Sequence, residues 1–139
     1  MKTRTLALAA VLLAATAGAA QGDELAAALE KVSKDQIAAF NQEDVAATMG
    51  FAYSKSPDYE SAKTDLAALF SDTDAKAEQM SFAYIGHDDE FAVGRVKVKV
   101  TATDPGFLNN VVDAIIVFHS EGGAWKVWDT YLLGSELVE

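Results

Sequence analysis

Hydrophobic and polar residues alternate most regularly in the last third of the chain, which predicts three β-strands over residues 90–101, 111–120 and 124–132. In the first run, valines alternate with Arg95 and Lys97, and a period of two is typical of a strand with one buried face. The middle run is apolar on both faces, as in a strand that is covered on both sides. We therefore predict one antiparallel meander.

The turn between the last two strands is expected at Ser120-Glu121-Gly122-Gly123, with Glu121 and Gly122 as the loop residues. This register places Phe118 opposite Trp125 and Ala114 opposite Asp129, and the preceding pair is expected to place Lys99 opposite Asp113. A slip of one residue would exchange the two faces of the sheet. The predicted inner face carries Val96, Val98, Val100, Ala114, Ile116, Phe118, Trp125 and Val127, followed by Asp129 and Tyr131.

The first half of the domain shows helical periodicity instead. Apolar residues recur at helical spacing from Leu25 to Phe40, with Asp23 as the expected N-cap. A second, shorter helix is predicted from Asp44 to about Ala52, and a third begins with Ser56 as N-cap and Pro57 at its first position. A strand over residues 79–86 then leads into the meander. Helices followed by antiparallel strands predict an α+β fold, with the helices packed into the concave face of a strongly curved sheet.

The 139-residue chain has room for one domain, predicted over residues 21–139. Residues 1–20 resemble a secretory signal peptide, with Lys2 and Arg4 before an apolar run and small residues at its end. We therefore expect a periplasmic or secreted protein. The apolar run is too short for a lasting membrane span, so no membrane attachment is expected after the signal is removed.

The net charge of −10 at pH 7 argues against nucleic acid as a partner, because binding to phosphate backbones depends on lysine and arginine. The chain has no cysteine, so its stability is expected to come from packing and not from disulfides.

Three segments resemble the nuclear-transport-factor-2-like superfamily, with its ketosteroid-isomerase-like and polyketide-cyclase-like members. The first consists of Phe40 to Asp44 together with Met49, Tyr53 and Ser56 to Tyr59. The second runs from Tyr84 to Val96, and the third from Gly122 to Trp128. The resemblance implies a cone-shaped fold, a curved sheet wrapped around a long helix, a pocket at the open end and frequent homodimers. It implies no particular activity, because this fold carries both enzymes and non-catalytic binding proteins.

Asp129 and Tyr131 are the candidate catalytic residues. On the inner face, a partly desolvated carboxylate could act as a general base, and a tyrosine hydroxyl could polarise a carbonyl. The alternative is that both side chains reach water at the frayed end of the sheet. No residue of a ketosteroid isomerase catalytic set can be matched.

Four further residues, Met49, Tyr53, Ala114 and Trp125, are predicted to line a ligand pocket, although such residues more often belong to a core. His87 and the three acidic residues after it are adjacent in a tight turn and cannot converge on one ion, so no metal site and no cofactor are predicted.

On the outer face, Ile115, Val117 and Trp128 form a predicted apolar patch, which would suit a homodimer formed sheet to sheet. The sequence therefore favours an exported module that binds a small apolar or amphipathic ligand, or is otherwise non-catalytic. The alternative is a cofactor-independent isomerase, dehydratase or cyclase that uses Asp129 as base and Tyr131 as donor.

Overall fold

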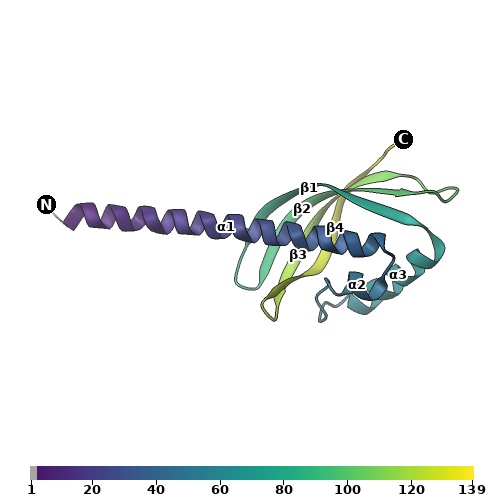
Figure 1. Ribbon diagram of the computed structural model, residues 1–139, viewed down its shortest axis with the longest axis horizontal. Coiled ribbons are helices and arrows are strands. Elements are labelled where there is room, and N and C mark those ends of the chain that lie inside the picture. The colour runs from purple at the N-terminus through teal and green to yellow at the C-terminus, as the bar shows by residue number, and fades with distance from the viewer. Residues whose placement is uncertain (1–2) are drawn as a thin grey trace.

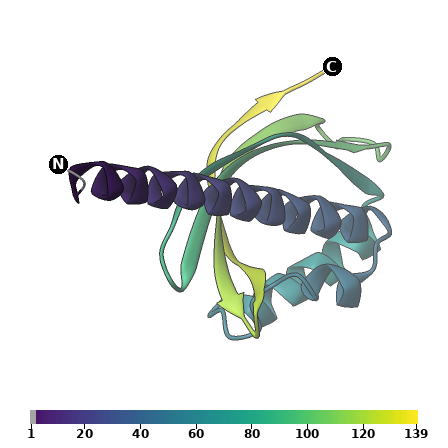
Figure 2. The same cartoon turned by 60° about the vertical axis from the view of Figure 1, so that its left-hand side comes forward.

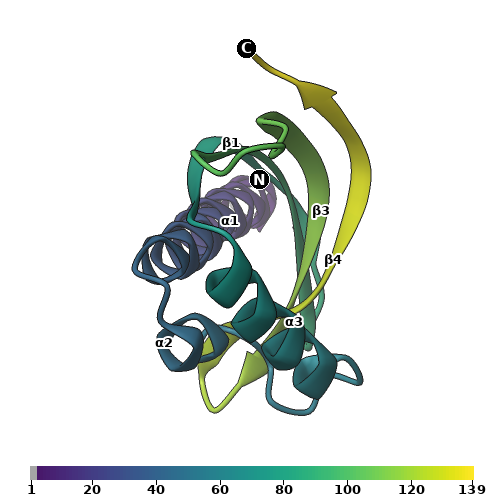
Figure 3. The same cartoon turned by 90° about the vertical axis from the view of Figure 1, so that its right-hand side faces the viewer.

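The computed structural model describes residues 3–139, and for residues 3–21 it describes the backbone alone. Three helices precede four strands, and all neighbouring strands pair antiparallel in the order β1-β2-β3-β4. The helices lie on one side of the sheet (Figure 3), which curves around α1 (Figure 2). The predicted α+β class and curved sheet are thus confirmed. The element bounds are α1 Thr3–Asn41, α2 Val45–Met49, α3 Tyr59–Asp72, β1 Ala75–His87, β2 Phe91–Ala102, β3 Asn110–Glu121 and β4 Ala124–Leu137.

Helix α1 is longer than predicted and extends well beyond the sheet at its N-terminal end (Figure 1). The expected N-cap at Asp23 is wrong, because the helix is already formed from Thr3 onwards. Lys2 and the other side chains of the predicted signal peptide, residues 1–20, lie outside the described residues, so that signal stays a prediction. No helix in the described part of the chain is long and apolar enough to cross a membrane.

The C-terminal half of α1 is tied to the sheet at two places on β1. Ser33 Oγ donates to Gln79 Oε1 over 2.6 Å. At the end of the helix, the side-chain amide of Asn41 donates to the carbonyl of Ala77 over 2.8 Å and accepts from its N–H over 2.7 Å. By pairing with both the N–H and the C=O of one residue, this amide supplies the two hydrogen bonds that a neighbouring strand would otherwise supply. These contacts hold α1 across the concave face.

The shorter helices begin partly where the sequence predicts. Asp44 caps α2, since its Oδ1 accepts from the N–H of Ala47 over 2.8 Å, as predicted. The predicted N-cap of α3 at Ser56 is wrong, because the helix begins at Tyr59 and Asp58 holds the cap position. The Ser56 hydroxyl donates instead to the carbonyl of Trp128 over 2.8 Å, which binds the α2–α3 loop to β4.

The predicted inner face is correct for β2, β3 and the start of β4, and it forms the hydrophobic core. Phe118 and Ala92 are 0% exposed, and Leu29 of α1 is equally buried against them. Partly buried side chains, Trp125 among them, complete the packing. The buried members of this core are Leu29, Ala92, Val96, Ala114, Ile116, Phe118 and Val127.

Both predicted registers are wrong by two residues, which leaves the faces unchanged. Gly122 and Gly123 both have positive φ, 58° and 82°, so these two residues make the turn and not Glu121 with Gly122. A two-residue hairpin turn with positive φ at both positions matches the twist of the strands, and glycine adopts it without strain. Phe118 consequently pairs with Val127. On the other side of β3, Asp113 pairs with Lys97 and not with Lys99.

A β-bulge at Trp128 overturns the predicted facing of Asp129 and Tyr131. Val127 lies opposite Phe118, but Asp129 lies opposite Val117, so β4 has one extra residue at this point. An extra residue reverses the alternation of side chains beyond it. Tyr131, opposite Ile115, therefore belongs to the outer face and is 53% exposed.

Candidate functional site

An apolar cavity of about 380 Å³ lies between the three helices and the inner face of the sheet. Its lining follows from the spacing of the residues. Positions one turn apart on α1 and on α3 point to the same side, as do alternate residues of the strands. None of the described residues that line the cavity carries an ionisable side chain. They are Gln36, Ile37, Phe40, Thr48, Met49, Ala62, Leu66, Ala77, Val98, Val100 and Val112.

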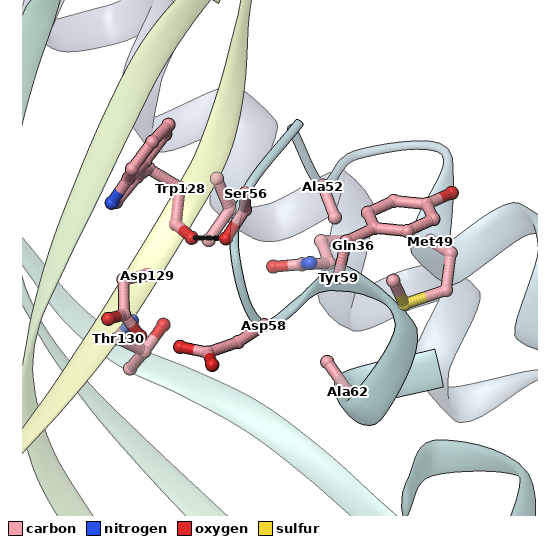
Figure 4. Close-up of a pocket in the computed structure, with 11 residues that line it drawn as sticks. Gln36, Met49, Ala52, Ser56, Asp58, Tyr59, Ala62, Trp128, Asp129 and Thr130 are labelled. Carbon is pink, nitrogen blue, oxygen red and sulfur yellow. Dashed lines mark hydrogen bonds between the residues drawn. The ribbon is translucent and has the colours of Figure 1, made fainter. Parts of the chain in front are cut away.

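A second cavity, of about 240 Å³, adjoins the first at the free edge of β4 (Figure 4). Gln36, Met49 and Ala62 line both cavities. The remaining lining is more polar, because the α2–α3 loop and the bulged part of β4 supply it. It consists of Ala52, Ser56, Asp58, Tyr59, Val127, Trp128, Asp129 and Thr130.

Backbone hydrogen bonds hold the α2–α3 loop beside β4. The N–H of Tyr53 donates to the carbonyl of Val127 over 2.7 Å, and the N–H of Val127 donates to the carbonyl of Phe51 over 2.8 Å. Ala52 thereby forms a short parallel bridge with Val127. These bonds fix the loop against β4, where its Ala52 and Ser56 line the second cavity.

The structure brings Asp129 and Tyr131 together at this edge, but not in the cone interior. Asp129 lines the second cavity, and its Oδ1 accepts from the N–H of Thr130 over 2.7 Å. A hydrogen bond to Asp129 and the charge of that carboxylate raise the pKa of Tyr131 above its ordinary value, and the charge of Asp58 adds to the effect. A tyrosine with a raised pKa is a weaker acid, which makes it a poorer proton donor.

The residues predicted to line the pocket separate into different places. Met49 is buried and lines both cavities. Ala114 is 2% exposed within the core, and Trp125 packs against the core near the hairpin. Tyr53 lies beside His119 and Trp128, with its ring tilted against theirs and ring centroids 4.2 and 5.2 Å away, on the other side of β4 from Phe118 and Val127.

Most of the lining was identified from the sequence only as buried helix and strand faces. Phe40, Leu66, Val98 and Val100 fit the helical and alternating patterns, but these patterns report burial and not whether a neighbouring side chain fills the space. No sequence pattern indicated that Asp58 and Thr130 line a cavity. Only the bulge and the start of α3 bring them to one cavity.

Within the described residues, no group of three or more histidine, cysteine, aspartate or glutamate side chains could hold a metal ion. The acidic turn after β1 instead stabilises itself. Asp88 Oδ1 accepts from the N–H groups of Phe91, over 2.7 Å, and Glu90, over 2.8 Å, and these bonds hold the pKa of Asp88 below its ordinary value.

The outer face of the sheet carries Ile115 and Val117, as predicted. Trp128 is at the hairpin end of this face but is half covered by Tyr53. Tyr131 and Leu133 add exposed apolar surface, at 53% and 54% exposure. Arg95 and Asp113 cross the face as a two-bonded ion pair, with N–O distances of 2.9 and 2.6 Å.

The family described as "Anti-sigma-I factor RsgI9, C-terminal domain" matches residues 31–137. This chain belongs to that family. The match begins inside α1 and ends at the last residue of β4, so it covers both cavities and the whole sheet. A search of curated proteins with this chain found no match.

Solved structures show that this RsgI9-type domain has the nuclear transport factor 2-like fold. A protein from Streptomyces avermitilis, described as a dehydratase of that family, superimposes with a TM-score of 0.67 at 12% identity, covering 84% of this chain and 98% of its own. A ketosteroid isomerase-like protein from Erwinia carotovora gives 0.59 at 15% identity, covering 78% and 96%. The predicted superfamily resemblance is confirmed as to fold.

Bd1075 of Bdellovibrio bacteriovorus also superimposes, with a TM-score of 0.63 at 14% identity over 75% of this chain. The RsgI9-type domain corresponds to only 38% of the Bd1075 chain. At such identities the likeness concerns the fold alone.

Proposed function

We propose that this chain is an exported small-ligand-binding module that catalyses no reaction. The observation that supports it best is the apolar cavity of about 380 Å³, because its described lining carries no ionisable side chain and the hydroxyl of Thr48 donates to the backbone carbonyl of Asp44. A cavity of this kind can bind an apolar group by removing it from water. The family name, which refers to a domain of an anti-sigma factor and not to an enzyme, agrees with this proposal.

The alternative is an enzyme that uses Asp129 as base and Tyr131 as donor, as the names of several structural neighbours suggest. Two observations make it the less favoured candidate. Tyr131 is 53% exposed, and its hydroxyl is hydrogen-bonded to Asp129 and not free to polarise a substrate carbonyl. Neither residue lines the apolar cavity, where a substrate body would be held.

The binding function is tested by filling the cavity from α3. Ala62 is an exposed small residue that lines both cavities, so Ala62→Trp introduces a large side chain there without replacing a core residue. We expect the affinity for 1-octanol, measured by isothermal titration calorimetry, to fall about tenfold or more, because contact area in the cavity is lost.

Ala68→Trp is the matched control, because Ala68 is exposed on the same helix and lines neither cavity. It should leave the affinity for 1-octanol unchanged. Equal affinities of the two variants and the parent protein, or no binding of 1-octanol by the parent protein, would contradict the proposal.

We further propose that two copies associate through the outer face, because Ile115 and Val117 lie there beside the exposed Tyr131 and Leu133. Sedimentation equilibrium should report a dimer, and Ile115→Lys should convert it to a monomer by placing a charge in the interface. Ala67→Lys on the exposed side of α3 should leave the dimer intact. A monomeric parent protein would refute the dimer without affecting the binding proposal.

A further inference from the structure

The two adjoining cavities differ in chemistry. The larger one is lined almost entirely by apolar side chains, whereas the smaller one adds Asp58, Asp129 and Thr130 to an apolar floor that includes Val127. The side chains of Gln36, Met49 and Ala62 form the boundary between them. A ligand that spans this boundary would meet an apolar surface at one end and carboxylates at the other.

Asp58 is placed in an unusual way. It occupies the N-cap position of α3, where aspartate normally accepts a hydrogen bond from the first turn, but its side chain makes no such bond. Figure 4 shows its carboxylate pointing toward Thr130 and Asp129, across the mouth of the second cavity. The helix therefore leaves this carboxylate available to the cavity.

Two carboxylates that face one cavity repel each other unless a positive charge lies between them. Among the side chains that the structure describes, no lysine or arginine forms an ion pair with Asp58 or Asp129. Both carboxylates raise the pKa of Tyr131, Asp129 more than Asp58, so the two negative charges lie near each other at this edge of β4. A cationic group in the cavity would relieve this repulsion.

We propose that the two cavities together bind an amphipathic amine, with its alkyl or aryl part in the apolar cavity and its ammonium group between Asp58 and Asp129. This inference rests on the proposed binding function and adds the chemical class of the ligand. A bare metal ion suits the site less well, because within the described residues no group of three or more aspartate, glutamate, histidine or cysteine side chains could hold one.

Three probes with the same alkyl chain test the inference: 1-octylamine, 1-octanol and octanoate. At pH 7 the amine is positively charged, the alcohol is neutral and the acid is negatively charged. We expect 1-octylamine to bind about fivefold or more tighter than 1-octanol, and octanoate to bind most weakly, as measured by isothermal titration calorimetry at low salt.

The double variant Asp58→Asn with Asp129→Asn should abolish the preference for the amine and still bind 1-octanol. Because the whole chain is acidic, the double variant Asp65→Asn with Asp72→Asn is the control. It removes the same charge from α3 positions that line neither cavity, and it should keep the preference.

The outcomes separate this inference from the proposed function. If 1-octanol and 1-octylamine bind equally well, or if both double variants lose the preference alike, the ammonium site is refuted while the cavity remains a binding site. If none of the three probes binds, both the inference and the proposed function are refuted.

Discussion

Phe118→Ala is expected to lower the free energy of unfolding by about 3–5 kcal/mol, because it removes a fully buried aromatic side chain and leaves a cavity. Phe118 is 0% exposed and belongs to the same hydrophobic cluster as Leu29 of α1 and the buried residues of the sheet. Its ring also lies edge-on to Phe82, with centroids 6.4 Å apart. Chemical denaturation followed by circular dichroism measures the change.

A pair of isoleucines provides the control for this prediction. Ile116→Ala, at 6% exposure on the inner face, should cost about 2–5 kcal/mol. Ile85→Ala, at 57% exposure on β1, should cost about 0.5 kcal/mol or less. Similar losses for the two isoleucine variants would show that the assignment of buried and exposed sides is wrong.

Gly94→Ala is expected to lower the free energy of unfolding by about 1–3 kcal/mol through overpacking. Gly94 lies on the inner face opposite Ile116, and a Cβ atom at this position would come within 2.5 Å of the Phe82 ring. Real contacts of this kind are not found at such a distance, so the ring has to move and lose part of its packing in the core.

Two further variants isolate the cause of that loss. Gly86→Ala places a Cβ on the same pair of strands with no atom within 4 Å, so its stability should be unchanged or slightly increased. Adding Phe82→Leu to Gly94→Ala should restore part of the lost stability, which a double-mutant cycle detects. Strict additivity of the two substitutions would rule out the close contact as the cause.

The fold was predictable because its elements follow simple periodicities. Alternation in β2 identifies the inner face from Val96 and Val98, and helical spacing in α1 identifies the side that carries Leu29. The end of α1 and the cap at Asp44 could also be predicted from the sequence, because the polar residues after Phe40 interrupt the apolar pattern.

The candidate site was less predictable, because it depends on an irregularity. The bulge at Trp128 moves Asp129 and Tyr131 from the expected inner face to the edge and outer face. The alternation of residues in β4 does not predict this extra residue. The two-residue errors in register had no such effect, because a shift of two keeps every side chain on its face. The apolar cavity was also hidden, because a residue that lines a cavity and one that fills a core follow the same pattern.

The central claim is that an apolar group occupies the space between α1, α3 and the inner face of the sheet. Nuclear Overhauser contacts between 1-octanol and the protein methyl groups test it directly. The account predicts contacts from the alkyl protons to Val98, Val100, Val112 and Leu66, which line the apolar cavity. Contacts confined to Ile115, Val117 and other outer-face residues, with none to these four, would contradict it.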